Sequence, residues 1–341
     1  MKPAIRPALV LALLACSITL LPPPGVAQDG SLLQRLKERR QQRQQQKNAT
    51  DAGSEGALTQ PGDYTFTFEH DGLKRMYRVH VPTSYAPARP APLLVALHGG
   101  GGSMDYQADD SRYGLISKSE QAGFIAVFPN GFSKFRSGKF ATWNAGNCCG
   151  GARDNNVDDV GFIRQVVARV TRQVNIDRNR IYATGMSNGA MMAYRLACEM
   201  SDVFKAVAPV AGTDNTANCA PARPVSVLHI HAQNDDHVLF NGGVGPGVPD
   251  DSKVTDFTSV PATISKWVRQ DACSASPRRV LDKQGAYCDL YAPCGGQAEV
   301  ELCVTASGGH SWPGGQKARG NEPPSQAISA DDVMWEFFSR H

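Results

Sequence analysis

A serine flanked by glycines is the first residue in this sequence whose setting suggests chemistry. Ser187 lies in "TGMSNGAMMAY", at the centre of the pattern G-x-S-x-G. This pattern marks a nucleophilic serine on a sharp strand-to-helix turn, although glycine and serine also form ordinary turns. The apolar run 180–185 predicts a strand before Ser187, and residues 189–200 predict a helix after it. The setting therefore favours a nucleophile.

A nucleophilic serine needs a base, and the base needs an acid that orients it. In a strand–turn–helix setting, the acid and then the histidine follow the serine along the chain. His310 stands in the glycine-rich loop "SGGHSWPGG", directly after the last predicted strand. Asp235 and Asp236 follow the predicted strand 225–232, at the sheet edge where open α/β sheets gather their active sites. We predict Ser187 as nucleophile, His310 as base and one of these two aspartates as the acid.

The other histidines downstream of the serine suit the role of base less well. His229 and His231 lie within a predicted strand, which indicates packed or strand-end residues. His237 lies in a loop, and His341 is the last residue of the chain.

A run of four glycines follows the predicted strand 93–97 in "LHGGGGS". An HGGG-type loop contributes backbone N–H groups to an oxyanion hole, and the residue after the nucleophile contributes another. A phosphate-binding loop is the competing interpretation, but the sequence lacks the pattern G-x-x-x-x-G-K-[ST]. We predict Gly99, Gly100, Gly101 and Asn188 as the oxyanion donors.

Strands alternate with helices along the chain after an N-terminal hairpin, predicted over 64–81 with its turn at Asp71-Gly72. Further strands are predicted at 93–97, 123–130, 180–185, 204–212, 225–232 and 298–306. Helices are predicted at 160–174 (capped by Asp158 or Asp159), at 189–200, at 261–270, and after Ser329, which begins a capping-box pattern with Asp332. This order predicts one α/β domain over 61–341, with a mostly parallel central sheet and helices on both faces.

Residues 1–27 have the features of a secretory signal peptide. Lys2 and Arg6 precede a mostly apolar run that ends in small residues at Ala27. The run is too short and too interrupted by proline for a transmembrane helix, so no transmembrane span is expected. We expect a secreted protein; a lipoprotein anchored at Cys16 and a periplasmic protein are the alternatives.

A polar, basic arm and linker is predicted over residues 28–60. Its segment 34–47 carries six Lys or Arg and one Glu, with a spacer as the favoured role and binding to an anionic surface as the alternative. The formal net charge of the chain is +3, of which the signal peptide supplies two positive charges and the arm five. The remainder therefore carries about −4, which argues against a domain that binds nucleic acid.

The chain has nine cysteines, of which eight remain without Cys16. An even set in an exported protein predicts disulfide bonds. No pair of C-x-x-C segments with zinc spacing occurs, and no metal site is predicted. Cys148 and Cys149 are adjacent, and we expect each to bond to a distant partner.

Four segments together resemble the secreted polyhydroxybutyrate depolymerase/feruloyl esterase family of α/β-hydrolases: "LLVALHGGGG", "WNAGNCCGGARDNNVDDVGF", "IYATGMSNGAMMAYRLACE" and "GGHSWPGG". The resemblance covers residues 61–341. It implies the α/β-hydrolase fold, with Ser187 as nucleophile and His310 as base. The family segment His-Gly-x-x-Asp aligns so that Asp235, rather than Asp236, is the acid.

The same resemblance implies a serine carboxylic-ester hydrolase for poly- or oligo(3-hydroxyalkanoate) esters or feruloyl esters, which needs no cofactor. The expected partner is a polyester oligomer or a plant cell-wall ester. An acetylxylan esterase or an acyltransferase of the same fold is the alternative, and a non-catalytic secreted binding protein is the alternative outside this class. Ala232 replaces the family's usual glycine, and Gly100 stands where many members carry cysteine. Trp312 and Trp143 flank the shared motifs as candidate substrate-binding residues, and core packing is the competing interpretation.

Overall fold

The computed structural model describes residues 56–316 and 322–341, so the predicted signal peptide, with Cys16, and the segment 34–47 lie outside the described residues. Within the described part, ten strands form one sheet in the order β1-β2-β4-β3-β5-β6-β7-β10-β9-β8. The strands are β1 Gly62–His70, β2 Leu73–Val81, β3 Ala91–Leu97, β4 Ile125–Pro129, β5 Ile176–Met186, β6 Ala206–Val210, β7 Ser226–Ala232, β8 Arg278–Lys283, β9 Ala286–Tyr291 and β10 Val300–Thr305.

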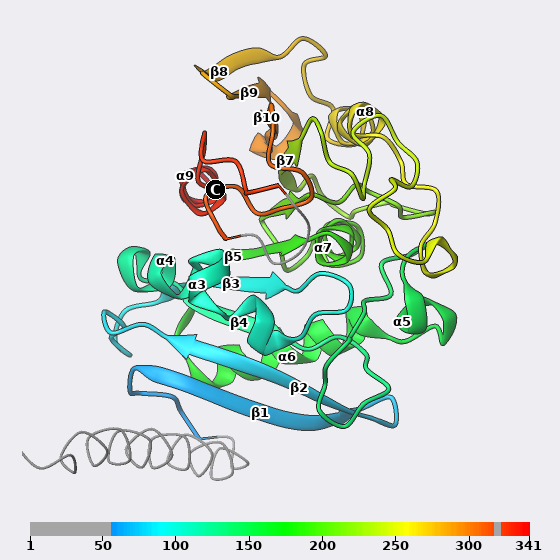
Figure 1. Cartoon of the computed structure of the whole chain (residues 1–341). Helices are drawn as coiled ribbons and strands as arrows, with labels where there is room; N and C mark the ends of the chain where they lie inside the picture. Colours follow the sequence, from blue (N-terminus) through cyan, green and yellow to red (C-terminus); the bar gives the residue numbers. More distant parts are fainter. Residues whose placement is uncertain (1–55, 317–321) are drawn as a thin grey trace, which may run out of the picture. The chain divides into compact units, whose positions relative to one another are not determined.

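The α-helices lie between these strands and after the last one (Figure 1). They are α2 Met104–Gln107, α3 Asp110–Tyr113, α4 Leu115–Ala122, α5 Gly150–Asp154, α6 Asp159–Gln173, α7 Asn188–Glu199, α8 Val260–Gln270 and α9 Ala330–Ser339. Two short 3-10 helices, η1 Asp251–Lys253 and η2 Gly295–Gln297, lie in connecting segments. None of the described helices is long and apolar enough to cross a membrane.

The six central strands, β4, β3, β5, β6, β7 and β10, run parallel. The antiparallel hairpin β1–β2 flanks them at one end of the sheet, and the hairpin β8–β9 flanks them at the other. Parallel strands share one carboxyl edge, so the loops after β3, β5, β7 and β10 meet there. The predicted α/β fold with a mostly parallel sheet is confirmed.

The sheet separates two hydrophobic cores, because successive side chains of a strand point to opposite faces. In β3, Leu93, Val95 and Leu97 face the core covered by α6, α7 and α8. Leu94 and Ala96 face the core that α4 and α9 help to cover. A strand buried on both faces explains the continuous apolar run in its sequence.

The predicted hairpin and helix caps are present. Asp71 and Gly72 form the turn between β1 and β2 with φ of 50° and 69°, as a two-residue turn with positive φ at both positions requires. Asp158 caps α6 by accepting a hydrogen bond from the Gly161 N–H, and Ser329 caps α9.

Three features differ from the sequence-based expectation. The hairpin β8–β9 and the short helices α2 to α5 were not predicted. Leu58 is buried against the core and donates its N–H to Gln173 O at 2.8 Å, so packing begins before residue 61. The sequence of β8 shows little alternation of apolar and polar residues. This is because β8 is an exposed edge strand, and only burial of one face imposes that alternation.

The eight cysteines of the described part form four disulfides: Cys148–Cys149, Cys198–Cys219, Cys273–Cys294 and Cys288–Cys303. The prediction of disulfides is confirmed. The expectation that Cys148 and Cys149 bond to distant partners is wrong, because the two adjacent residues bond to each other.

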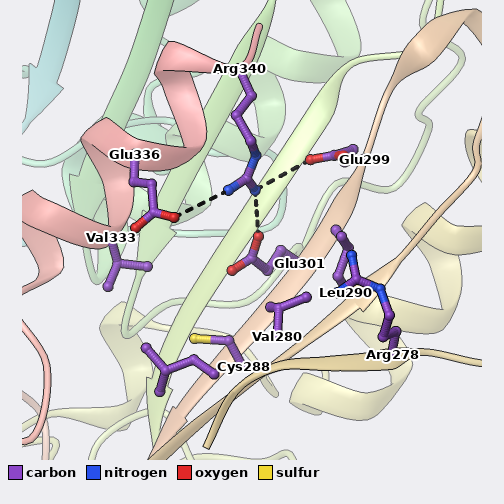
Figure 2. Close-up of a pocket in the computed structure, with 10 residues that line it drawn as sticks. Arg278, Val280, Cys288, Leu290, Glu299, Glu301, Val333, Glu336 and Arg340 are labelled. Carbon is purple, nitrogen blue, oxygen red and sulfur yellow. Dashed lines mark hydrogen bonds and ion pairs between the residues drawn. The ribbon is translucent and has the colours of Figure 1, made fainter.

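A hollow lies between α9 and the β8–β9 hairpin (Figure 2). This hairpin is at the opposite end of the strand order from β1. Arg340 at the end of α9 reaches Glu301 at 2.7 Å, Glu299 at 3.3 Å and Glu336 at 3.8 Å. Val280 of β8 also lines the hollow. These ion pairs tie α9 to the sheet at a place remote from the predicted catalytic loops.

Candidate active site

Ser187 occupies the turn between β5 and α7 with the backbone angles φ 58° and ψ −121°. A non-glycine residue with positive φ is strained, and such strain is concentrated at functional sites. Glycine is required beside it, because a Cβ on Gly189 would overlap the backbone oxygens of Leu97 and His98. The helix and the strand β3 can therefore approach closely enough to present the serine at the sheet edge.

Asp235 and His310 lie in the loops after β7 and β10 and are in direct contact. The His310 Nδ1 lies 2.9 Å from Asp235 Oδ2 and 3.1 Å from Oδ1. Asp235 also accepts the N–H groups of His237 and Val238 at 2.8 and 2.9 Å. Burial raises the pKa of Asp235, but the charge of His310 and the hydrogen bonds from His231 and His310 outweigh it and hold this pKa well below its usual range.

Asp236 points elsewhere. Its Oδ1 lies 2.7 Å from His237 Nδ1, in a half-exposed pair. The His237 ring stacks on the His310 ring, with centroids 4.5 Å apart and an interplanar angle of 15°. The structure thus brings His310 together with Asp235, whereas Asp236 pairs with His237, the histidine that stacks on His310.

A buried line of hydrogen bonds, which the sequence did not reveal, reaches Asp235 from behind. It runs from Tyr194 on α7 through two histidines on β7. The Tyr194 hydroxyl lies 2.7 Å from His229 Nδ1, and His229 Nε2 lies 3.1 Å from His231 Nδ1. His231 Nε2 lies 2.8 Å from Val238 O and 3.3 Å from Asp235 Oδ2. We call Tyr194, His229 and His231 the buried chain.

One arrangement of protons satisfies every member of the buried chain. The carbonyl Val238 O can only accept, so the neutral form of His231 carries its proton on Nε2 and accepts at Nδ1. His229 must then donate from Nε2 and accept at Nδ1 from the Tyr194 hydroxyl. Burial holds the pKa of His229 well below its usual range and raises that of Tyr194, so both are neutral. In this arrangement the hydroxyl of Tyr194 donates to His229, His229 donates to His231, and His231 donates to Val238 O beside Asp235.

The sequence contained a partial signal for this feature. His229 and His231 are two apart on a strand, and such residues share one face of the sheet. Both are buried, as expected for packed residues. Tyr194 has no comparable signal, because only the tertiary fold, in which α7 packs on β5 and β6, brings it to His229.

The glycine loop passes against the turn that carries Ser187. A Cβ on Gly99 would lie 3.5 Å from Ser187 Cβ, and one on Gly100 would lie 3.6 Å from Asn188 Cβ. The Gly99 carbonyl accepts from Gly102 N at 3.0 Å and lies 2.8 Å from His98 Nδ1. Because the peptide is planar and trans, the N–H of Gly100 points the opposite way.

His98 is held as a neutral imidazole in one tautomer. Its Nε2 accepts the N–H of Gly131 at 2.9 Å, so the proton lies on Nδ1 and is donated to the Gly99 carbonyl. Burial lowers the pKa of His98 to about 4. A histidine that stays neutral keeps the orientation of the Gly99 peptide constant across neutral pH.

The predicted oxyanion donors differ in availability. Gly101 donates its N–H to Ala141 O at 2.8 Å, so it is already engaged, contrary to the prediction. Among the described residues, no acceptor is found for the N–H of Gly99 or of Gly100, and Gly100 is the one whose N–H points away from the engaged Gly99 carbonyl. Asn188 is the first residue of α7, a position with no helical acceptor for its N–H. Gly100 and Asn188 are therefore the better-placed donors.

Trp143 connects the glycine loop to the start of α7 and does not face substrate, contrary to its prediction as a substrate-binding residue. It is fully buried, and its indole N–H donates to His98 O at 2.9 Å. Its backbone N–H and C=O bond to the Asn188 side chain at 2.7 and 3.0 Å. Trp143 thus fixes the start of α7 relative to the glycine loop.

Trp312 is also a core residue, contrary to the expectation of a substrate-facing wall. Its exposure is 2%, its ring packs edge-on against Tyr113 at 5.4 Å, and its indole N–H reaches Asp331 at 3.2 Å. Asp158 and Asp159 have structural roles, as expected. Asp158 caps α6, and Asp159 pairs with Arg75 at 2.6 Å.

Three groups of side chains in the described residues have the spacing to bind a metal ion, and each contains residues that already have another role. Two such groups contain the disulfide pairs Cys198–Cys219 and Cys288–Cys303. The third consists of Asp235, His237 and His310, whose ligand atoms lie within 4.8 Å of one another. The hydrogen bonds described above engage the Asp235 carboxylate and the Nδ1 atoms of both histidines.

Solved structures resemble the fold. An S-formylglutathione hydrolase from Agrobacterium tumefaciens matches with a TM-score of 0.52 and 13% identity over 84% of this chain and 97% of that one. An acetyl xylan esterase from Aspergillus awamori matches with a TM-score of 0.51 and 15% identity over 78% of this chain and 94% of that one. At these identities the likeness shows the fold alone.

Known sequences resemble the chain more closely. Feruloyl esterase B of Piromyces equi is 30% identical, over 68% of this chain, which spans 42% of that protein's length. A putative esterase, NocK, of Nocardia uniformis subsp. tsuyamanensis is 32% identical over 72% of each chain. The model of the family described as esterase PHB depolymerase matches residues 75–262. The chain therefore belongs to the esterase PHB depolymerase family.

Proposed function

We propose that the protein is a serine carboxylic-ester hydrolase in which Ser187, His310 and Asp235 form the catalytic triad. The observation that carries this proposal is the His310–Asp235 contact, in loops at the same sheet edge as the strained Ser187 turn. The esterase names among its relatives support the same reaction class.

The hydrogen bonds assign a role to each group. His310 donates from Nδ1 to Asp235, which leaves Nε2 to take the proton of the Ser187 hydroxyl. The serine oxygen then attacks the ester carbonyl, and the N–H groups of Gly100 and Asn188 stabilise the oxyanion. His310 returns the proton to the departing alcohol. Water attacks the acyl-enzyme by the same route and releases the acid.

The triad proposal is tested by replacing the nucleophile. Ser187→Ala should reduce kcat on a p-nitrophenyl ester by about 10⁴–10⁶-fold without loss of fold, because the acyl-enzyme can no longer form. Ser84→Ala, at an exposed serine, is the matched control. A Ser187→Ala protein with unchanged turnover refutes the proposal and indicates a different nucleophile, whereas a wild type without turnover favours a non-catalytic binding protein.

For the substrate, we propose feruloyl esters or 3-hydroxyalkanoate esters, as suggested by the relatives' names and by the family. Acetylated xylan is the alternative, because a relative from Neocallimastix patriciarum is named as an acetylxylan esterase/xylanase. Hydrolysis rates on methyl ferulate, 3-hydroxybutyrate oligomers and acetylated xylan separate the three. Ester products formed with an added alcohol acceptor would instead indicate an acyltransferase.

We also propose that the protein is exported. All eight cysteines of the described part are paired, and such disulfides persist in oxidising compartments. Mass spectrometry of the mature N-terminus tests this proposal. Cleavage after Ala27 indicates a secreted protein, a lipid-modified Cys16 indicates a lipoprotein, and an intact Met1 in a cell extract contradicts export.

A further inference from the structure

The segment from Gly131 to Thr142 forms a protruding loop, which we call the aromatic loop. Its ends pair through hydrogen bonds between Phe132 and Thr142, each 2.9 Å long. Ala141 joins the aromatic loop to the oxyanion loop, since it accepts from Gly101 N at 2.8 Å and donates to Gly102 O at 3.0 Å. The aromatic loop is therefore continuous with the proposed active site.

Two phenylalanines stand exposed on this loop. Among the described residues, three large apolar side chains are exposed: Phe140 at 63%, Phe135 at 59% and Val280 at 38%. The rings of Phe135 and Phe140 contact each other edge to face, with centroids 5.7 Å apart. The pair forms a small aromatic surface beside the oxyanion loop, whereas Val280 lies in the remote hollow of Figure 2.

The backbone adds an independent sign of function. Phe140 has a φ of 55°, a conformation that is strained for a bulky residue. Folding gains nothing from holding a large apolar side chain in water on a strained backbone. Such strain persists at ligand-binding positions, where it presents a side chain in a fixed direction.

The charges of the loop limit what it can bind. Lys134, Arg136 and Lys139 are exposed, and the loop contains no acidic residue. The chain without its first 27 residues and the segment 34–47 carries about −4, so this positive group stands out locally. Aromatic faces combined with cations suit a ligand that has both apolar faces and carboxylates.

We propose that the aromatic loop binds the polysaccharide part of an acidic, uronic-acid-bearing polysaccharide ester. The C–H faces of the sugar rings pack on Phe135 and Phe140, since aromatic faces are electron-rich. The uronate carboxylates pair with Lys134, Arg136 and Lys139. This inference rests on the proposed ester hydrolysis and adds to it a binding surface for the alcohol part of the substrate.

Binding is measured separately from catalysis, so that the two proposals can fail separately. The probe is deacylated glucuronoxylan, titrated into the protein by calorimetry, with the same polymer after chemical reduction of its carboxyl groups as the neutral comparison. The variant Phe135→Asn/Phe140→Asn should weaken binding of both polymers about tenfold, because the aromatic contact area is lost. Asparagine tolerates positive φ, so the backbone of residue 140 is preserved.

A second variant tests the charges. Lys134→Gln/Arg136→Gln/Lys139→Gln should weaken only the binding of glucuronoxylan and abolish its salt dependence. Val280→Asn, at the exposed apolar residue outside the loop, is the control and should bind as the wild type does. An unchanged melting temperature shows that each variant is folded.

The proposal is overturned if the double phenylalanine variant binds both polymers as tightly as the wild type. It is also overturned if the two polymers bind equally well, or if the protein adsorbs to an uncharged polyester film and binds neither polymer. Loss of ester hydrolysis in Ser187→Ala tests the proposed function independently, because calorimetry on deacylated polymer needs no turnover.

Discussion

Asp235 is the most heavily bonded side chain of the proposed site. It receives two backbone N–H groups and contacts His310 and His231, while its neighbour Asp236 contacts only the half-exposed His237. A carboxylate with this many donors stays ionised and immobile, as the orienting acid of a triad must.

Replacing the two aspartates separately should give very different results. Asp235→Asn should lower kcat on a p-nitrophenyl ester by about 10³–10⁴-fold, because an amide cannot stabilise the His310 imidazolium. Asp236→Asn, the matched change one residue away, should lower kcat by less than about tenfold. Steady-state kinetics on both variants checks this, and equal or reversed effects would move the acid to Asp236.

The buried chain should contribute to stability through its terminal hydroxyl. Tyr194→Phe should lower the free energy of unfolding by about 1–3 kcal/mol, because His229 Nδ1 loses its donor in a buried site. Tyr182→Phe is the control, since the Tyr182 hydroxyl is buried with no hydrogen-bond partner among the described residues. Urea denaturation should show a loss for the first variant alone; equal losses would deny the Tyr194 hydroxyl any special role.

At this scale the sequence predicted the residues of the proposed triad better than their surroundings. Motif spacing and chain order selected Ser187, His310 and the pair Asp235 and Asp236, and the family resemblance selected Asp235 from that pair. The engaged N–H of Gly101, the burial of Trp312 and the position of Tyr194 depend on contacts between segments far apart in the chain. No local pattern encodes such contacts.

At the scale of elements, the carboxyl ends of the parallel strands assemble the site, and most of these elements follow from sequence pattern. The apolar strands and the long amphipathic helices, such as α6 with its cap at Asp158, are where the pattern predicts them. The hairpin β8–β9 was missed because β8 is an exposed edge strand of mainly charged residues. Its pairing with β9, not burial, makes it a strand.

The end of α8 carries an unfavourable charge. Asp271 is the C-cap residue of this helix and is 1% exposed, and its Oδ2 has no partner among the described residues. Burial raises the pKa of Asp271 to about 7, and a carboxylate at a helix C-terminus also opposes the helix dipole.

Asp271→Asn should therefore stabilise the protein in a pH-dependent way. The folded pKa of about 7 lies above the ordinary value of 3.8, so the wild type loses stability as pH rises between these values. The variant should match the wild type near pH 4 and be more stable at pH 8 by about 1 kcal/mol or more. Thermal unfolding from pH 4 to 8 checks this, with the exposed Asp282→Asn as control; a constant difference across this range would contradict it.

On the scale of the whole molecule, two disulfides connect the end of α7 and the segment after α8 to other parts of the chain, away from the centre of the sheet. Cys198 at the end of α7 bonds to Cys219, and Cys273 just after α8 bonds to Cys294. Both bonds span 21 residues along the sequence, so each restricts a moderate loop in the unfolded chain.

Removing one of these bonds should destabilise the fold measurably. Cys198→Ala/Cys219→Ala should lower the free energy of unfolding by about 2–4 kcal/mol, because the unfolded chain regains the freedom of the closed loop. Chemical denaturation of this variant and of the wild type, both without reductant, measures the loss. An unchanged denaturation midpoint would show that this disulfide is structurally dispensable.

The buried chain has a geometric consequence for the triad as a whole. Ser187 directly precedes α7, and Tyr194 lies about two turns further along. The buried chain leads from Tyr194 to Asp235 and so to His310. The nucleophile and the acid are thus linked from behind through one rigid helix, as well as facing the same sheet edge. Within the proposed triad, α7 and the buried chain therefore connect Ser187 to Asp235, and a direct contact connects Asp235 to His310.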